Sequence, residues 1–230
     1  MSANRSVHQR ILCQDRPEPI SFGPGGNVAR LARLVEIKEH MVLTVVKYGA
    51  PVLRQKGERI GAITPSIQQL IVDMFDTMYA HKGIGLAAQQ VGVPLRLTVL
   101  DVRGVTDRPS TLERHGKEAD VEKFMPLVLI NPEITPVGKP VKGPEGCLSF
   151  PEIYADISRP EVVDVKALDS ALRPLEFRCG GLLARAIQHE TDHLNGLLFI
   201  DRMSKDVKEE MRAELEELQT QTKAALTAKR

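Results

Sequence analysis

Two histidines and a glutamate have a spacing suited to metal chemistry in the segment Gln188-His-Glu-Thr-Asp-His193. In a helix, His189 and His193 lie one turn apart on the same face, so both imidazoles can reach one ion. Glu190 follows the first histidine and can direct its carboxylate toward a water on that ion. This H-E-x-x-H pattern predicts a metal-dependent hydrolase, although two histidines on a partly buried helix also reach this spacing by chance.

A catalytic zinc-type site usually has three protein ligands and an open fourth position, so a third ligand must be found. Phe199 stands where metzincin proteases place a third histidine, and phenylalanine binds no metal. Asp201 and Glu209 are downstream carboxylates without a supporting motif. Cys147, within Glu145-Gly-Cys-Leu-Ser149, is the better candidate. A thiolate with two imidazoles forms an open site suited to zinc or ferrous iron.

Three blocks of the sequence together resemble the peptide deformylase family. They are Gly83-Ile-Gly-Leu-Ala-Ala-Gln-Gln90, Glu145-Gly-Cys-Leu-Ser149 and Gln188-His-Glu-Thr-Asp-His193, in the family's order. Chance agreement across three blocks is far rarer than across one. The resemblance runs from about residue 41 to about residue 204. It implies removal of the N-terminal formyl group from formyl-methionine of nascent polypeptides, with release of formate.

The resemblance also implies a mechanism that uses one metal ion per chain. The ligands would be Cys147, His189 and His193. Water on the ion would attack the formyl carbon, while Glu190 acts as general base and then as general acid toward the leaving amine. Ferrous iron is the family's usual metal, with zinc, nickel or cobalt as substitutes. The same three ligands accept any of these ions.

Other residues in the three blocks are expected to contact the substrate. The Gln90 side-chain amide and the Leu148 backbone N–H would donate to the oxyanion that forms at the formyl group. Arg185 departs from the apolar residue that the family commonly has one helical turn before the first histidine, so the side-chain pocket is expected to differ there. The residues expected to bind the substrate are Ile84, Gly85, Glu145, Gly146 and Leu182.

Two competing functions make different use of the cysteines. A metal-stabilised module without activity would take Cys179 as a fourth ligand and would not need Glu190. A zincin-type peptidase would take a downstream ligand and would not need Cys147. We expect Cys179 to be a small buried thiol instead. The third cysteine, Cys13, has no assigned role, and three scattered cysteines favour a reducing compartment.

The composition is that of an ordinary globular chain. With 230 residues, 42% hydrophobic and 27% charged, the chain can bury the core of one domain with appendages. Its formal net charge of +1 gives no reason to expect bulk binding to nucleic acid. No apolar run approaches the roughly 20 residues that span a bilayer. We therefore expect a cytoplasmic monomer that acts on nascent formyl-methionyl peptides and does not bind membranes.

The pattern of elements predicts an α+β protein. Thr64-Pro65 begins a helix with one apolar stripe, and Asn195-Gly196 ends the histidine-bearing helix. Residues 103–125 are polar and are expected to form a surface loop. Strands are expected at 96–102, 127–130 and 163–167, with 175–178 as the hairpin partner of the last.

The expected organisation has three parts. Residues 41–203 would be the catalytic domain, and the resemblance implies that its short, largely antiparallel strands partly wrap a central metal-binding helix. Residues 1–40 would be a flexible N-terminal extension. Residues 204–230 would form a C-terminal amphipathic helix. The resemblance suggests that this helix contacts the ribosome near the nascent-chain exit.

Overall fold

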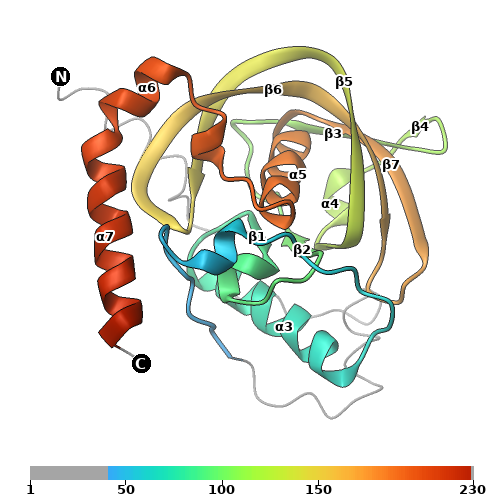
Figure 1. The fold of residues 1–230 in the computed structure, drawn as a ribbon. Helices are drawn as coiled ribbons and strands as arrows, with labels where there is room; N and C mark the ends of the chain where they lie inside the picture. The colour runs from blue at the N-terminus through green and yellow to red at the C-terminus, as the bar shows by residue number, and fades with distance from the viewer. Residues whose placement is uncertain (1–40, 229–230) are drawn as a thin grey trace.

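The computed structural model describes residues 41–228. The extension expected at 1–40 lies outside the described residues, as do the last two residues of the expected C-terminal helix. An antiparallel sheet with strand order β1-β2-β5-β6-β7-β3-β4 curls around helix α5 (Gly181–Leu194), as Figure 1 shows. The predicted α+β class, with strands wrapped around a central helix, is confirmed.

Two of the strands are much longer than expected. The strands are β1 (Gly85–Ala87), β2 (Leu97–Leu100), β3 (Ser110–Arg114), β4 (Lys117–Glu118), β5 (Leu127–Cys147), β6 (Phe150–Leu168) and β7 (Pro174–Gly180). The strand expected at 127–130 does not end before Asn131-Pro132, because the register shifts between Ile130 and Glu133 and pairing with β6 resumes. A bulge accommodates the missing N–H of proline, so the strand continues through it.

The prediction of a surface loop at 103–125 is wrong from residue 110 onward. Strands β3 and β4 form a hairpin there, β3 pairs with β7, and helix α4 (Val121–Phe124) follows. Within β3 only Leu112 is buried. A strand with one inward apolar residue has almost no hydrophobic alternation, which explains why the sequence pattern did not reveal it.

Helix α3 (Pro65–Ala80) begins where the sequence predicted, and its apolar stripe packs on the sheet. The Thr64 hydroxyl accepts a hydrogen bond from the Ile67 N–H at 3.3 Å, and proline occupies the first turn. Its buried stripe, including Ile71, Met74 and Met78, packs with residues of β1 and β2 in one core cluster. This packing holds the start of β1 against the helix that precedes it.

Helix α5 passes through the interior of the molecule. Its first residue, Gly181, has φ +65°, and a β-carbon there would lie 2.1 Å from the Pro109 carbonyl oxygen, so the close approach requires glycine. The predicted ending is confirmed, because Gly196 adopts φ +73°. Nearly all of α5 is buried, so the side chains of His189, Glu190 and His193 project into the protein rather than into solvent.

The C-terminal segment forms two helices in place of one. Helix α6 (Lys205–Glu210) is capped by Ser204, and helix α7 (Arg212–Ala228) lies along the outside of the body (Figure 1). Leu215 is the buried residue of α7, and it packs in the cluster that contains Phe150 and Phe199.

Short 3-10 turns complete the fold: η1 (Pro51–Arg54), η2 (Ala88–Val91) and η3 (Phe199–Asp201). Within residues 41–228, no helix is both long and apolar enough to cross a bilayer.

Candidate functional site

Three potential metal ligands converge in the interior. Cys147 ends β5, while His189 and His193 project from one face of α5. One donor atom from each residue lies within 4.8 Å of the other two. Cys147 Sγ is 3.3 Å from His193 Nε2, and the two imidazole rings have centroids 5.1 Å apart. Residues that are distant in the sequence therefore form one cluster.

The chemistry of this cluster fits a divalent transition-metal ion. The Glu145 carboxylate accepts a hydrogen bond from His189 Nδ1 at 3.0 Å, which leaves His189 Nε2 free to bind metal. One sulfur and two imidazole nitrogens are the donors that zinc and ferrous iron accept. Three protein ligands also leave a coordination position for water or substrate.

The residues of the competing metal sites are occupied elsewhere. Cys179 is buried in β7, where desolvation raises the pKa of its thiol, and it does not belong to the ligand cluster. Asp201 forms an ion pair with Arg54 and accepts from the Leu198 N–H. Phe199 packs in the apolar core. In the described part of the chain, neither a fourth protein ligand nor a downstream ligand joins the three residues.

Glu190 lies beside the ligands with its carboxylate against β1. A β-carbon built on Gly85 would be 2.5 Å from Glu190 Oε1, so the absence of a side chain there makes room for the carboxylate. Its second oxygen, Oε2, is buried without a hydrogen-bond partner among the described residues. Burial raises the pKa of Glu190 to about 7, although the nearby charges of His189 and Arg159 act to lower that pKa. A carboxylate with such a pKa exchanges protons readily near neutrality.

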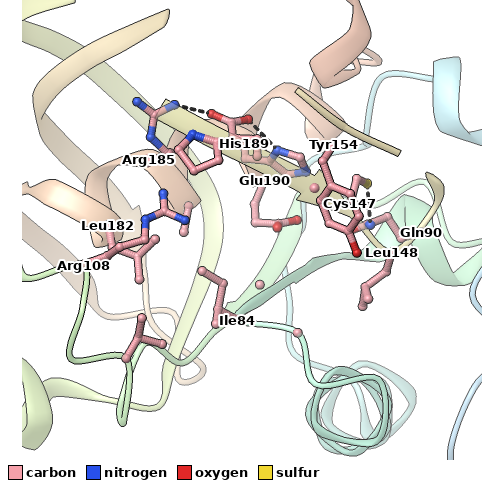
Figure 2. Close-up of a pocket in the computed structure, with 17 residues that line it drawn as sticks. Ile84, Gln90, Arg108, Cys147, Leu148, Tyr154, Leu182, Arg185, His189 and Glu190 are labelled. Carbon is pink, nitrogen blue, oxygen red and sulfur yellow. Dashed lines mark hydrogen bonds and ion pairs between the residues drawn. The ribbon is translucent and has the colours of Figure 1, made fainter. Parts of the chain in front are cut away.

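Gln90 has a fixed orientation beside Cys147. Its Oε1 accepts from the Ala87 N–H at 2.8 Å, so its amide NH₂ points toward Cys147 Sγ, 3.4 Å away (Figure 2). Leu148 follows the ligand cysteine in the turn between β5 and β6, and its carbonyl accepts from Lys47 Nζ at 2.8 Å. Both residues that carry the predicted oxyanion donors are therefore hydrogen-bonded to neighbouring parts of the chain.

Glu145 is held by cations on two sides. Its carboxylate accepts from Arg159 Nε at 2.6 Å and Nη2 at 2.9 Å, and from Arg185 Nη1 at 2.8 Å. Arg159 also pairs with Asp192 at 2.7 Å. Burial alone would raise the pKa of Glu145, but hydrogen bonds from His189 and Arg159 outweigh it and hold that pKa well below its usual range. The carboxylate is thus an anion fixed behind His189.

Sequence reasoning missed Arg159. It lies in β6 two residues after Ile157, on the same inward-facing side of the strand, but the strand was expected to begin only at residue 163. A longer predicted strand would have placed a charged residue inside the core, which is a signal for a buried ion pair.

A single pocket brings the predicted residues together. All of the predicted site residues except His193 line this pocket. Further lining comes from Ala186, Val105 and Tyr154.

Arg185 lines the pocket, but its guanidinium donates to the carbonyls of Val141 and Ile157 as well as to Glu145. Both terminal nitrogens of the unexpected arginine therefore have hydrogen-bond partners.

Comparison with known proteins agrees with this geometry. Residues 42–209 match the protein-family model described as Polypeptide deformylase. A peptide deformylase of Opitutus terrae is 45% identical over 187 residues, which cover 80% of this chain and 97% of the relative. A peptide deformylase of Methylacidiphilum infernorum is 46% identical over 178 residues, covering 77% and 93% of the two chains.

Solved structures give the same result. The crystal structure of Arabidopsis thaliana peptide deformylase 1B in complex with an inhibitor aligns with a TM-score of 0.68 and 38% identity, covering 80% of this chain and 93% of the other. A peptide deformylase of Synechococcus elongatus in complex with actinonin aligns with a TM-score of 0.63 and 42% identity, covering 78% and 86%. At these identities the similarity extends beyond the fold to the sequence.

Proposed function

The chain belongs to the polypeptide deformylase family, and on that premise we propose that it hydrolyses the formyl group from formyl-methionine at the N-terminus of nascent polypeptides. The observation that carries this proposal is the convergence of Cys147, His189 and His193 beside the buried Glu190. The apolar walls of the adjoining pocket suit a methionine side chain. We propose that residues 41–203 form the catalytic domain.

Cys147, His189 and His193 would hold one divalent ion, for which we propose ferrous iron, with zinc, nickel or cobalt as functional substitutes. When bound, such an ion supplies Lewis acidity that makes water nucleophilic near neutral pH. Glu145 supports this arrangement because its hydrogen bond at 3.0 Å fixes the orientation of the His189 ring.

Glu190 would carry the proton through the reaction. As a water oxygen forms its bond to the formyl carbon, Glu190 takes the water proton. It then delivers that proton to the methionine nitrogen as the carbon–nitrogen bond breaks, so formate and a free amine leave. The buried position and the pKa of about 7 support both roles.

Gln90 and Leu148 would stabilise the charge that develops on the formyl oxygen. The Gln90 NH₂ is already oriented toward Cys147, and the Leu148 backbone N–H belongs to the adjacent residue. Loss of one such donor raises the barrier by roughly 3 kcal/mol in comparable sites. Two donors at fixed positions lower the barrier without reorganisation during the reaction.

The substrate would lie against Ile84, Gly85, Gly146 and Leu182, which line the pocket beside the ligands. Glu145 also lines it, but its hydrogen bonds favour a role in holding His189. A narrow space around the reacting carbon would accept formyl and exclude acetyl, because an added methyl group must clash.

We also propose a cytoplasmic monomer that meets its substrates at the ribosome. Helices α6 and α7 carry exposed basic residues, among them Lys205, Lys208 and Arg212, which would be the contacts to ribosomal RNA, but acidic residues outnumber the basic ones on both helices and Glu209 pairs with Arg212. Leu215 anchors α7 to the body, so these cations are held outward.

Formate release from formyl-Met-Ala-Ser by anaerobically prepared protein tests the function. Wild type should release formate, and Glu190→Ala should retain its metal while losing activity. If wild type released no formate while holding a full complement of ferrous iron, the assignment would be wrong. If Glu190→Ala kept both metal and activity, the proton-transfer role would be wrong.

A further inference from the structure

Arg108 lines the pocket on the segment that joins β2 to β3 (Figure 2). Its side chain is half-buried, and burial together with the nearby Arg185 lowers its pKa. Arginine nevertheless stays charged at any physiological pH. Among the residues that the structure describes, none forms a hydrogen bond or an ion pair with its guanidinium. Arg108 is therefore a partly desolvated cation without a fixed counter-ion.

The backbone beside Arg108 is fixed. The Pro109 carbonyl accepts from the Leu182 N–H at 3.2 Å, and Ser110 Oγ accepts from the Leu183 N–H at 3.0 Å. Ser110 also forms a bridge with Gly181. These contacts attach the segment to the N-terminus of α5, the helix that carries the metal ligands. Arg108 is therefore presented at a defined place rather than on a free loop.

The other charges near Arg108 already have partners, apart from one exposed acid. Arg185 and Arg159 share the Glu145 carboxylate, which also accepts from His189. Asp107 is the remaining nearby acid, and it is exposed. The side of the pocket formed by Arg108 and Leu182 consequently has an excess of positive charge. A carboxylate of a bound peptide can supply the missing negative charge.

We propose that Arg108 determines specificity in the reaction proposed above, by pairing with a carboxylate carried one or two residues after formyl-methionine. A guanidinium offers paired N–H donors that match a carboxylate, and partial burial strengthens such a pair. The preferred substrates are thus formyl-methionyl peptides with aspartate or glutamate at the second or third position. This inference rests on the proposed function.

A substrate panel tests the inference on the wild-type protein. Formyl-Met-Asp-Ala and formyl-Met-Ala-Asp are compared with the matched asparagine and lysine peptides at low ionic strength. At one of the two positions, kcat/KM should be about fivefold to tenfold higher for aspartate than for lysine, with asparagine between them, mainly through KM. The ratio should shrink in 1 M salt, where charges are screened within about 3 Å.

Variants assign the preference to Arg108. Arg108→Met and Arg108→Gln should bring the aspartate-to-lysine ratio close to one, and Arg108→Glu should invert it. Arg59→Met removes an exposed arginine that pairs with Glu133 away from the pocket, so it should keep the wild-type ratio. Thermal melts establish that each variant is folded.

The outcomes separate the two proposals. Equal kcat/KM for aspartate and lysine peptides in wild type would overturn the role of Arg108 and leave deformylation intact. A ratio that survives in both neutral variants would also overturn it. Failure to release formate from any peptide would remove both proposals.

Discussion

Glu190 occupies the space that a side chain at Gly85 would fill. A β-carbon on residue 85 would stand 2.5 Å from Glu190 Oε1 and 3.0 Å from its carboxyl carbon. Strand β1 and helix α5 therefore approach each other at a distance that glycine permits. The position of the proposed general base depends on a residue that carries no functional group.

Gly85→Ala should lower kcat by about 10- to 100-fold, since a displacement on the order of 1 Å in a catalytic group costs this much. Metal content should stay near one ion per chain because no ligand moves. Steady-state formate release and metal analysis check both results. Gly61→Ala is the matched control, since nothing lies within 4 Å of a β-carbon there. Wild-type activity in Gly85→Ala would show that Glu190 needs no such space.

Glu190→Gln should reduce kcat by about 10²- to 10⁴-fold, because it keeps the shape of the side chain and removes the proton acceptor. Metal affinity should change little. Formate release under single-turnover conditions measures the chemical step directly. Retention of more than about a tenth of the wild-type rate would assign proton transfer to another group.

Glu145→Gln should weaken metal binding by roughly 10- to 100-fold, because the anion that orients His189 is lost. The substitution also leaves Arg159 with less charge compensation in the interior. Competition with a chromogenic chelator measures the affinity. Glu176→Gln is the control, since that carboxylate is exposed on β7 beside Lys166. Equal affinities in the two variants would exclude a role for Glu145 in ligand orientation.

Removal of the metal should destabilise the fold. A ligand present at 1,000 times its dissociation constant stabilises the native state by about 4 kcal/mol, so a chelator should lower Tm by several degrees. The Tm of Cys147→Ala should respond far less to the chelator, because one of the three ligands is missing. Differential scanning calorimetry with and without metal provides the comparison. An undiminished chelator effect in Cys147→Ala would instead favour a site that does not use this cysteine.

Asp101 should contribute stability that is lost in acid. Tyr79 donates to Asp101 at 2.6 Å, and Arg103 pairs with it at 2.6 Å. Burial acts to raise the pKa of Asp101, but the hydrogen bonds from Arg103 and Tyr79 outweigh it and lower that pKa below its ordinary value. The charged form is therefore favoured in the folded state. Its contribution is complete above the unfolded pKa of about 4 and disappears as pH falls through the lower folded pKa.

Asp101→Asn should accordingly cost about 1–3 kcal/mol at pH 7 and progressively less below about pH 4. Urea unfolding at several pH values measures the difference. Asp164→Asn breaks an exposed pair with Arg178 and should cost much less than Asp101→Asn, because solvent screens the pair. A penalty for Asp101→Asn that does not change with pH would show that charge is not its source.

The sequence by itself determined the donor atoms and the local elements. His189 and His193 are four residues apart, so helical geometry alone predicts that they share a face. The Thr64 cap and the positive φ at Gly196 are likewise local, because each depends on a few neighbouring residues. The resemblance across three blocks also links Cys147 to the two histidines on sequence alone.

Only the tertiary structure decided which distant side chains complete the site. Arg159 reaches Glu145 and Asp192 because β6 begins at Phe150, well before the strand predicted at 163–167, and Arg185 donates to carbonyls of two long strands. Such contacts depend on strand register, and a shift of one residue in β6 would turn the Arg159 side chain to the other face of the sheet. Strand pairing joins segments far apart in the chain, so no local pattern encodes it. For the same reason, the unpaired Arg108 became visible only when the fold placed it beside the pocket.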